Sequence, residues 1–304
     1  MTIMVIVTLL CMYVSLKMGA VMGLALGCIP FLMIFTYICI QYQYVSLILL
    51  AIVNYFLMGF GRYVTLPFPV SITFDIIFGL IFFTTMLRNL EFKHNTRNVF
   101  NLYFAFMVIW FLYCFINVGN HATGTIHFAA WLGNIRVISL YPILLSVVIA
   151  ISAKNYKFIH AFLMLWGILA LLAAAKAYCQ KNYGFDAAEW AWVSTRGAKT
   201  HLLSTGTRYF SFFTDAANFG CGMGFTMVVF SVASIYTSHK IQKIFYLVVA
   251  LATGYGLLVS GTRASLAVPI AGFALFIFIC KSWKISVASL SALALGIFFL
   301  AFTN

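Results

Sequence analysis

The 304-residue chain has a mean hydropathy of +1.06, with 64% hydrophobic and only 8% charged residues and a formal net charge of +13. Soluble domains carry about 25% charged residues, so this composition excludes a soluble globular protein. We expect one all-α, polytopic membrane domain over residues 1–304, with the lipid bilayer as a partner and no nucleic acid.

Apolar runs near the length that spans a bilayer, about 20 residues, recur along the whole chain. The hydropathy pattern predicts eleven apolar segments, of which the first is short for a membrane span. They cover residues 1–16, 18–40, 44–60, 71–88, 99–117, 134–152, 158–175, 215–237, 243–260, 264–280 and 285–302. The sequence therefore predicts about eleven transmembrane helices joined mostly by short loops.

Four short basic loops indicate the orientation of these helices. They lie at residues 88–97, 153–157, 238–243 and 281–284. They alternate with the remaining loops, so the positive-inside rule places them in the cytoplasm. By parity, the N-terminus is predicted to be cytoplasmic as well.

The number of cations does not by itself favour this orientation, because each side receives nine Lys or Arg. Their kind differs, since seven of the nine inside are Lys, whereas five of the nine outside are Arg. Arg presents a planar fork that suits phosphate and carboxylate, whereas Lys presents a compact charge. We expect an anionic ligand at the outer face, with anchoring to lipid headgroups as the alternative for any single Arg.

Residues 176–208 form the longest predicted loop, on the outer face. Trp190 and Trp192 suit a membrane interface, and we expect a short amphipathic helix lying on the outer leaflet. Asp186 and Glu189 fit the first turn of that helix, where negative charge is stabilising. We prefer this interpretation to a catalytic acid. Arg196 follows as a candidate substrate-binding residue.

A few ionisable residues fall elsewhere. Asp75 lies inside a predicted helix, where a charge is costly unless paired, and Arg62 or Arg136 is its expected partner. Arg136 is also a candidate substrate-binding residue. His121 and His127 are six residues apart, a spacing that does not place them on one helix face. No metal site or other cofactor is expected.

The stretch from Arg208 to Gly224 ends the long loop and begins an apolar helix. Thr214 or Asp215 is predicted to cap that helix, with Asn218 in its first turn as a further candidate for binding substrate. Small residues at 216, 220 and 224 let another helix approach closely. Arg208 therefore lies beside a helix N-terminus, which favours anions.

One helical hairpin later, the chain returns with Ser260-Gly-Thr-Arg263-Ala-Ser265. The segment 215–237 crosses inward and 243–260 crosses back, so this turn reaches the same face as Arg208. Two Arg residues near two helix N-termini fit a diphosphate. We expect Arg208 and Arg263 to converge, with Asp215 and Ser260 as further candidates for binding substrate.

These motifs resemble those of the O-antigen ligase and O-antigen polymerase family. The similarity rests on Arg208-x-x-Ser-Phe-Phe-x-Asp215-x-x-Asn218-Phe-Gly and on the later Ser260-Gly-Thr-Arg263-Ala-Ser. It is strongest over residues 204–280. Upstream of that range, only hydropathy and helix number are similar.

The resemblance implies a metal-independent glycosyltransferase in the bacterial inner membrane. The family transfers glycan from an undecaprenyl-diphosphate-linked donor, and its outer-face Arg residues, matched here by Arg208 and Arg263, bind the diphosphate. The sequence does not choose between a glycan, lipid A core or a protein as acceptor. The family also has a later outer loop with a catalytic His. No His of this chain matches it, so we expect a fragment whose catalytic loop and last helices follow Asn304.

Two other classes of function remain open. A polysaccharide-related transporter or flippase predicts buried ion pairs and broken helices in a repeated pattern. Asp75 is the only acidic residue deep in a predicted span, and no internal repeat is evident. A non-catalytic membrane subunit is compatible with the unmatched His.

Overall fold

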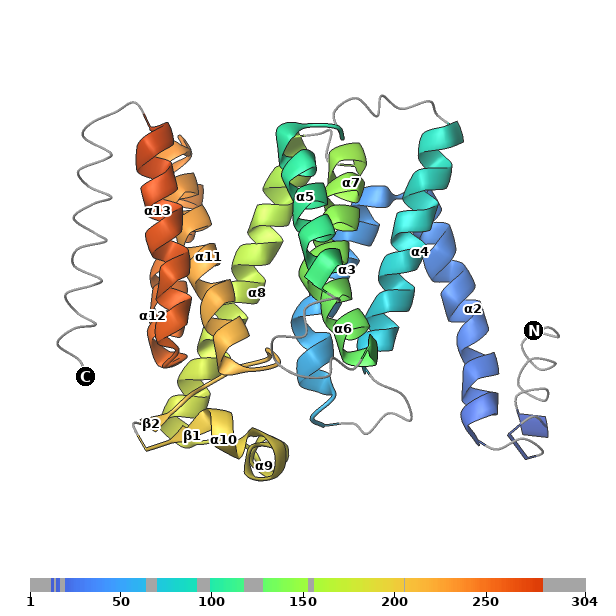
Figure 1. Cartoon of the computed structure of the whole chain (residues 1–304), viewed down its shortest axis with the longest axis horizontal. Coiled ribbons are helices and arrows are strands. Elements are labelled where there is room, and N and C mark those ends of the chain that lie inside the picture. The colour runs from blue at the N-terminus through green and yellow to red at the C-terminus, as the bar shows by residue number, and fades with distance from the viewer. Residues whose placement is uncertain are drawn as a thin grey trace. The chain divides into compact units, whose positions relative to one another are not determined.

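The chain is described by a computed structural model that covers residues 12–13, 15–16, 20–63, 70–91, 99–117, 128–152, 156–204 and 206–280 (Figure 1). It divides into two compact units, each made of two stretches of sequence. Unit 1 comprises Met1–Leu50 and Asp75–His160, and unit 2 comprises Ala51–Phe74 and Ala161–Asn304. The three boundaries fall within the helices α3 (Gln43–Phe60) and α4 (Val70–Glu91) and near the start of α8 (Tyr156–Tyr183).

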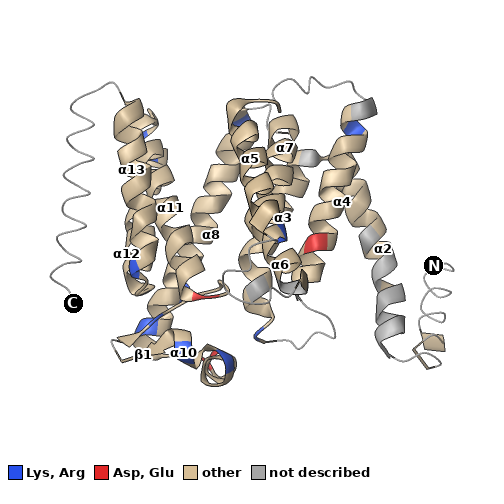
Figure 2. Cartoon of the chain, in the orientation of Figure 1, with Lys and Arg blue, Asp and Glu red and all other residues tan. Residues whose placement is uncertain are grey.

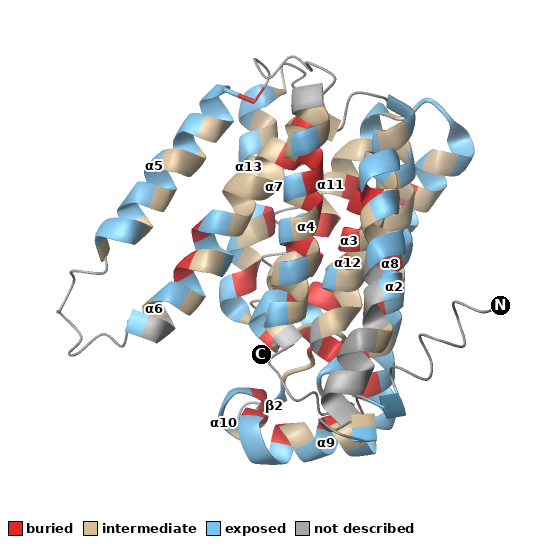
Figure 3. Cartoon of the chain, turned by 90° about the vertical axis from the view of Figure 1, so that its right-hand side faces the viewer, coloured by how far each residue is buried: buried red, intermediate tan, exposed pale blue. Residues whose placement is uncertain are grey.

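Among the described residues, six helical elements lie wholly or mostly in unit 1. They are α2 (Ala20–Gln41), α4 (Val70–Glu91), α5 (Leu102–Ile116), α6 (Phe128–Ile135), the π-helix η3 (Arg136–Leu140) and α7 (Tyr141–Ser152). The helix α3 (Gln43–Phe60) begins in unit 1 and ends in unit 2. Helix α5 has no buried residue (Figure 3).

Unit 2 combines long helices with a compact polar segment. Its long helices are α8 (Tyr156–Tyr183), α11 (Ala216–Tyr236) and α12 (Lys240–Val259), followed by the 3₁₀-helix η5 (Arg263–Leu266) and α13 (Ala267–Ile279). Between α8 and α11 lie α9 (Ala187–Trp192), the π-helix η4 (Val193–Gly197), α10 (Ala198–His201) and the strands β1 (Leu202–Leu203) and β2 (Gly206–Thr207). The two strands pair antiparallel, with Leu202 opposite Thr207.

The described chain is almost entirely helical, and five of its helical stretches are long and apolar enough to cross a membrane. Less than half of each apolar stretch is buried within the chain, so much apolar surface faces outward, as lipid contact requires. This is the architecture of an all-helical membrane protein. Nine of the eleven predicted segments coincide with described helices, whereas 285–302 and nearly all of 1–16 lie outside the described residues.

Two predicted boundaries differ from the structure by six residues or more. The segment predicted to end at residue 175 continues as α8 to Tyr183, so residues 176–183 belong to a helix and not to the long loop. Lys176 and Gln180 extend the helix there because both are good helix formers, and their side chains bond to residues of α9. The segment predicted to start at residue 134 is already helical from Phe128.

The core of unit 2 lies between α11 and α12, where Phe219, Met223 and Phe230 are fully buried. Small residues allow this packing, as the sequence predicts. A Cβ added to Gly220 would lie 2.6 Å from the hydroxyl oxygens of both Ser260 and Ser265. Such a distance leaves no room for a side chain, so Gly220 brings the start of α11 against the turn that carries Arg263.

Candidate functional site

The polar residues of unit 2 gather at one end, which we call the polar end: residues 61–63, 176–204, 206–215 and 260–263 (Figures 1 and 2). It carries seven Lys or Arg but three acidic residues. At the opposite ends of α8 and α12, the charged residues are Lys157, Lys240 and Lys243. The polar end therefore contains the candidate site.

Helices α9, η4 and α10 form one short helical segment at this end. Asp186 caps its start by accepting a hydrogen bond from the Glu189 amide (2.9 Å), and Glu189 accepts one from the Asp186 amide (3.2 Å). The four residues at positions 189, 193, 197 and 201 are buried, whereas Trp190, Arg196 and Lys199 are exposed. The predicted helix and the helix-start role of its two acids are thereby confirmed.

Glu189 also takes part in a buried ion pair. Its side chain is 1% exposed and lies 3.0 Å from the Lys176 Nζ, while Gln180 donates a hydrogen bond to it (2.9 Å). Lys176 also pairs with Asp186 (3.1 Å), and the Tyr63 hydroxyl donates to Asp186 (2.5 Å). We call these five residues the acidic network.

The pKa values in the acidic network oppose acid–base catalysis near neutral pH. Burial tends to raise the pKa of Asp186, but hydrogen bonds from Tyr63, the Glu189 amide and Lys176, together with the charge of Lys176, lower it below its usual value. Burial and the bond to Asp186 raise the pKa of Tyr63 to about 12. A general acid or base works best with a pKa near the working pH, so these groups are suited to holding α8, α9 and Tyr63 together.

The residues between β2 and α11, 208–215, form an irregular segment that we call the motif loop. Its start is fixed to α10, because the Arg208 amide donates to the His201 carbonyl (2.9 Å) and the His201 Nδ1 donates to the Arg208 carbonyl (3.2 Å). Its middle is fixed to α8 through Ser211, which donates to Gln180 (2.9 Å) and Ala173 (2.7 Å). Ser211 has a φ of 51°, a left-handed conformation that non-glycine residues keep only where surrounding contacts impose it.

Arg62 provides a third attachment of the motif loop. Its guanidinium donates to the carbonyl oxygens of Ser211 (3.2 Å), Phe213 and Thr214 (3.1 Å). Its Cζ lies 4.1 Å from the ring centroid of Phe210 and 4.7 Å from that of Trp192. From the sequence, Arg62 was one of two expected partners of Asp75. In the structure it binds the motif loop instead.

The motif loop ends at the predicted cap of α11. Asp215 accepts a hydrogen bond from the Asn218 amide (2.8 Å), which confirms the cap. The Asn218 side chain donates to Thr214 (2.6 Å) and to Asp215 (2.9 Å). A carboxylate of the chain thus occupies the N-terminus of α11, and an anionic ligand at this end depends on Arg side chains more than on the helix itself.

The turn after α12 lies against the motif loop. Gly261 has a φ of +62°, and a Cβ added to it would lie 3.2 Å from the Arg208 Cγ. Ser260 is fully buried, and its hydroxyl donates to Leu257 (2.7 Å) and accepts from the Thr262 amide (3.3 Å). Its side chain therefore stabilises the turn and is not free to contact a substrate, in contrast to our expectation. Arg263 follows and is exposed.

Most cations of the polar end have no acidic partner within 4.0 Å among the described residues; the exception is Lys176. Arg208 differs further, because its Nε is buried and has no hydrogen-bond partner. A buried donor without a partner is costly and calls for an explanation. Arg208 and Arg263, on two adjoining segments, have donors available for an anion.

No protein-family model matches the chain. Neither a curated protein nor a solved structure is found to be similar to it. The resemblance of residues 204–280 to O-antigen ligases and polymerases therefore rests on the motifs alone.

Arg136, the remaining predicted site residue, belongs to unit 1. It forms an ion pair with Asp75, one of the two pairings expected from the sequence. The pair joins α4 to η3, and the Arg136 Cζ lies 6.0 Å from the ring centroid of Tyr141. Arg136 thus balances the charge of Asp75 within apolar helices.

Arg62 is the residue whose role the sequence did not reveal. The hydrogen bonds to the motif loop join residues about 150 positions apart in the chain. The only local signal is an Arg directly after a helix-ending glycine, Gly61, and that signal predicts a helix end and not a contact. The burial of Glu189 was also not predicted, because its pairing with Lys176 requires α8 to continue past residue 175.

Proposed function

We propose that the chain transfers glycan from an undecaprenyl-diphosphate-linked donor, and that Arg208 and Arg263 bind the diphosphate. The observation that carries the proposal is the buried, unpartnered Nε of Arg208 beside the Gly261 turn that leads to Arg263. Two guanidinium groups can each offer two parallel hydrogen bonds to phosphate oxygens. The excess of cations over acids at the polar end also favours an anionic ligand.

The proposed role of the two Arg side chains in catalysis follows from where negative charge develops during the reaction. When the sugar leaves the lipid diphosphate, negative charge grows on the diphosphate oxygens. Arg side chains already in place stabilise this charge without reorganisation, and such stabilisation often contributes more to catalysis than any other effect. Arg208 is held in place by backbone bonds to His201 and by the Gly261 turn.

The proposal includes an orientation. The polar end of unit 2 faces the outside of the bacterial inner membrane, the N-terminus is cytoplasmic, and about eleven helices span the bilayer. The Lys-rich opposite ends of α8 and α12 support this orientation through the positive-inside rule. The acceptor is a glycan, lipid A core or a protein.

Replacing Arg263 with Lys in the full-length protein tests the proposal. Lys keeps the charge but loses the planar fork, so we expect glycan transfer to fall at least tenfold at unchanged abundance in the membrane. The measurement is surface polysaccharide in cells whose only copy is the variant. Lys199→Arg, at an exposed position of the same end, is the control and is expected to retain activity. Unchanged polysaccharide in Arg263→Lys cells would leave Arg263 as a lipid anchor, because Arg and Lys both reach the interface.

A transporter or flippase is the second candidate, and the Arg136–Asp75 pair favours it. Paired charges within apolar helices occur along transport pathways, and the adjacent π-helix η3 interrupts regular helix geometry in a way often found at functional sites. Asp75→Asn separates the two candidates, since it would abolish movement of a labelled lipid across proteoliposomes in a flippase. A glycosyltransferase would keep transfer activity in this variant as far as its fold survives. A non-catalytic subunit would show neither activity.

A further inference from the structure

The last turns of α3 pack against the motif loop. A Cβ added to Gly59 would lie 2.8 Å from the Phe212 carbonyl oxygen, so only glycine allows this approach. The ring of Phe56 meets that of Phe212 edge-on at 5.0 Å, and Tyr55 meets Phe213 at 5.4 Å. Positions 55, 59 and 62 follow helical spacing, so one face of α3, continued by Arg62, holds the loop.

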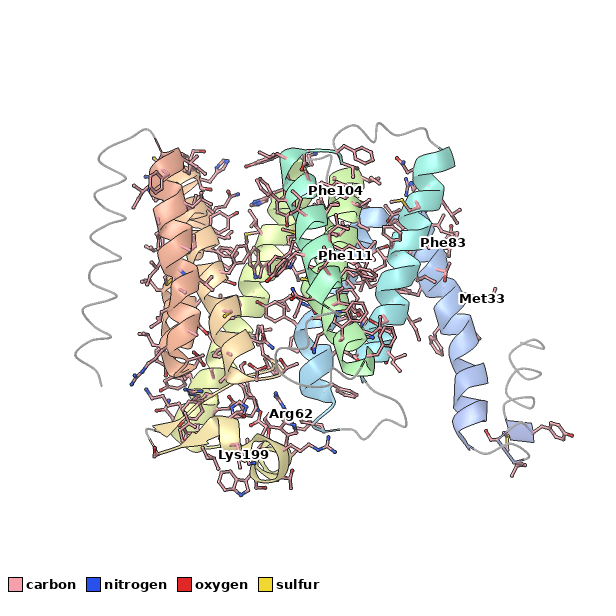
Figure 4. The ribbon with its side chains drawn as sticks, in the orientation of Figure 1. Met33, Arg62, Phe83, Phe104, Phe111 and Lys199 are labelled. Atoms are coloured by element: carbon pink, nitrogen blue, oxygen red, sulfur yellow. The ribbon has the colours of Figure 1, made fainter. Side chains whose placement is uncertain are left out.

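Arg62 is the polar part of this contact. Three backbone carbonyls of the motif loop converge on its guanidinium, and the rings of Phe210 and Trp192 lie within 5 Å of its Cζ. Figure 4 labels Arg62 and Lys199 of α10, both at the polar end of unit 2. A Lys at this position would keep a charge but would lose the planar group that stacks on aromatic rings while donating to several acceptors.

Arg62 is linked to Arg208 through two intermediate residues, Phe210 and His201. The Phe210 ring on which Arg62 stacks also meets the His201 ring at 4.8 Å. His201 in turn is bonded in both directions to the backbone of Arg208. Arg62 itself has no acidic partner within 4.0 Å among the residues described, and its donors are directed at carbonyls of the chain.

Arg62 keeps its charge at neutral pH. Burial lowers its pKa from the usual value to about 10, although Glu189, Tyr63, Asp215 and Asp186 act in the opposite direction. A pKa of about 10 leaves the guanidinium protonated at pH 7. The hydrogen bonds to the three carbonyls are therefore charge-assisted, which makes them stronger than bonds between neutral groups.

We infer that Arg62 is a positioning residue, which fixes the motif loop and thereby the place where the Arg208 guanidinium meets a lipid diphosphate. This inference rests on the proposed function, because it assigns the ligand of Arg208. Arg62 acts through the loop and does not touch the ligand. Its effect on binding is therefore present only while Arg208 can bind.

A double-mutant cycle between Arg62 and Arg208 tests this inference. The purified full-length protein in lipid nanodiscs is titrated with geranylgeranyl diphosphate, and geranylgeraniol serves as the control for the lipid tail. We expect Arg62→Lys to weaken diphosphate binding about tenfold when Arg208 is present and less than twofold in the Arg208→Ala background. Gly59→Ala, which presses on the Phe212 carbonyl from the same side, should behave in the same way. Gly79→Ala, where an added Cβ meets nothing within 4 Å, is the matched control.

Hydrogen exchange distinguishes positioning from a general loss of structure. In Arg62→Lys, amides of residues 208–214 should exchange faster, while those of α8 and α12 keep their protection. Faster exchange throughout unit 2 would mean that Arg62 supports the whole fold, and the inference would be wrong. Equal weakening by Arg62→Lys with and without Arg208 would mean that Arg62 contacts the ligand itself.

The outcome also separates this inference from the proposed function. If Arg208→Ala weakens binding of the diphosphate and Arg62→Lys does not, the inference fails and the proposed function stands. If Arg208→Ala leaves binding unchanged, the proposed diphosphate site fails and the positioning role fails with it.

Discussion

The acidic network and the motif loop lie at the same end of unit 2, but they differ in whether their charged side chains have partners within the chain. In the acidic network, Lys176 pairs with both Asp186 and Glu189 at 3.0–3.1 Å, and Gln180 and Tyr63 add hydrogen bonds. In the motif loop and the adjoining Gly261 turn, Arg208 and Arg263 have no acidic partner within 4.0 Å among the described residues. Charged side chains that are paired within the chain stabilise the structure, whereas cations without an acidic partner are available to a ligand. The comparison therefore favours a structural role for the first region and the proposed binding role for the second.

Removing the Glu189 carboxylate gives the largest expected effect. Glu189→Ala removes the buried partner of Lys176, which then keeps only Asp186. It also leaves the Gln180 amide without its acceptor, so we expect a loss of about 2–3 kcal/mol of unfolding free energy. Steric trapping in bicelles measures this loss. Asp186→Asn is the control, because Asn also caps helices well and the Asp186 side chain is 39% exposed, so its cost should be below about 1 kcal/mol. Equal losses in both variants would show that burial does not distinguish the two acids.

A methyl group at Gly261 is expected to perturb the proposed diphosphate site specifically. Gly261→Ala puts a non-glycine residue at a φ of +62° and places its Cβ 3.2 Å from the Arg208 Cγ. We expect binding of geranylgeranyl diphosphate to weaken about tenfold, or about 1.4 kcal/mol. Gly184→Ala carries a similar conformational cost, since its φ is +86° but an added Cβ meets nothing within 4 Å. It should destabilise the protein without weakening binding, and weaker binding in Gly184→Ala would argue against a role for the Gly261–Arg208 contact.

The smallest expected effect is a pH dependence of stability that arises where α10 meets the motif loop. Burial, followed by the charges of Arg62 and Arg208, lowers the pKa of His201 below its usual 6.5, and the bond to the Arg208 carbonyl and the charge of Asp215 only partly oppose this. Below pH 6.5 the unfolded chain therefore binds more protons than the folded chain. The stabilisation is present above pH 6.5 and is lost as the pH falls, by at most about 1.4 kcal/mol per pH unit.

His201→Gln isolates this contribution. The variant should show a shallower loss of thermal stability than the unsubstituted protein between pH 6.5 and 5. Asp186, whose pKa is lowered from 3.8, acts in the same direction only at lower pH and is unchanged in the variant. Identical slopes for the two proteins would mean that His201 does not resist protonation in the folded state.

The amino-acid sequence by itself determined the features that depend on neighbours a few residues apart. Apolar runs determined the helices, and Asp186 with Glu189, like Asp215 with Asn218, determined helix starts through bonds that span three residues. The small residues at 216, 220 and 224 and the hairpin of α11 and α12 also sufficed to bring the Gly261 turn to the motif loop. Local hydrogen bonds and helical periodicity can be read from sequence because their partners lie at fixed spacings.

Only the tertiary structure determined which polar and charged side chains have partners within the chain. Arg62 and Arg208 are both Arg residues of the segments that connect the long helices, yet one is bound to three carbonyls and the other has an unpartnered Nε. Ser260 lies in a motif that suggests substrate contact, yet it is buried and bonded within its own turn. These differences arise because α3 and α8 pack against the motif loop. The residues in contact are separated by some 30 to 150 positions in the sequence. No spacing in the sequence specifies such contacts, since they depend on how the helices pack together in the folded chain.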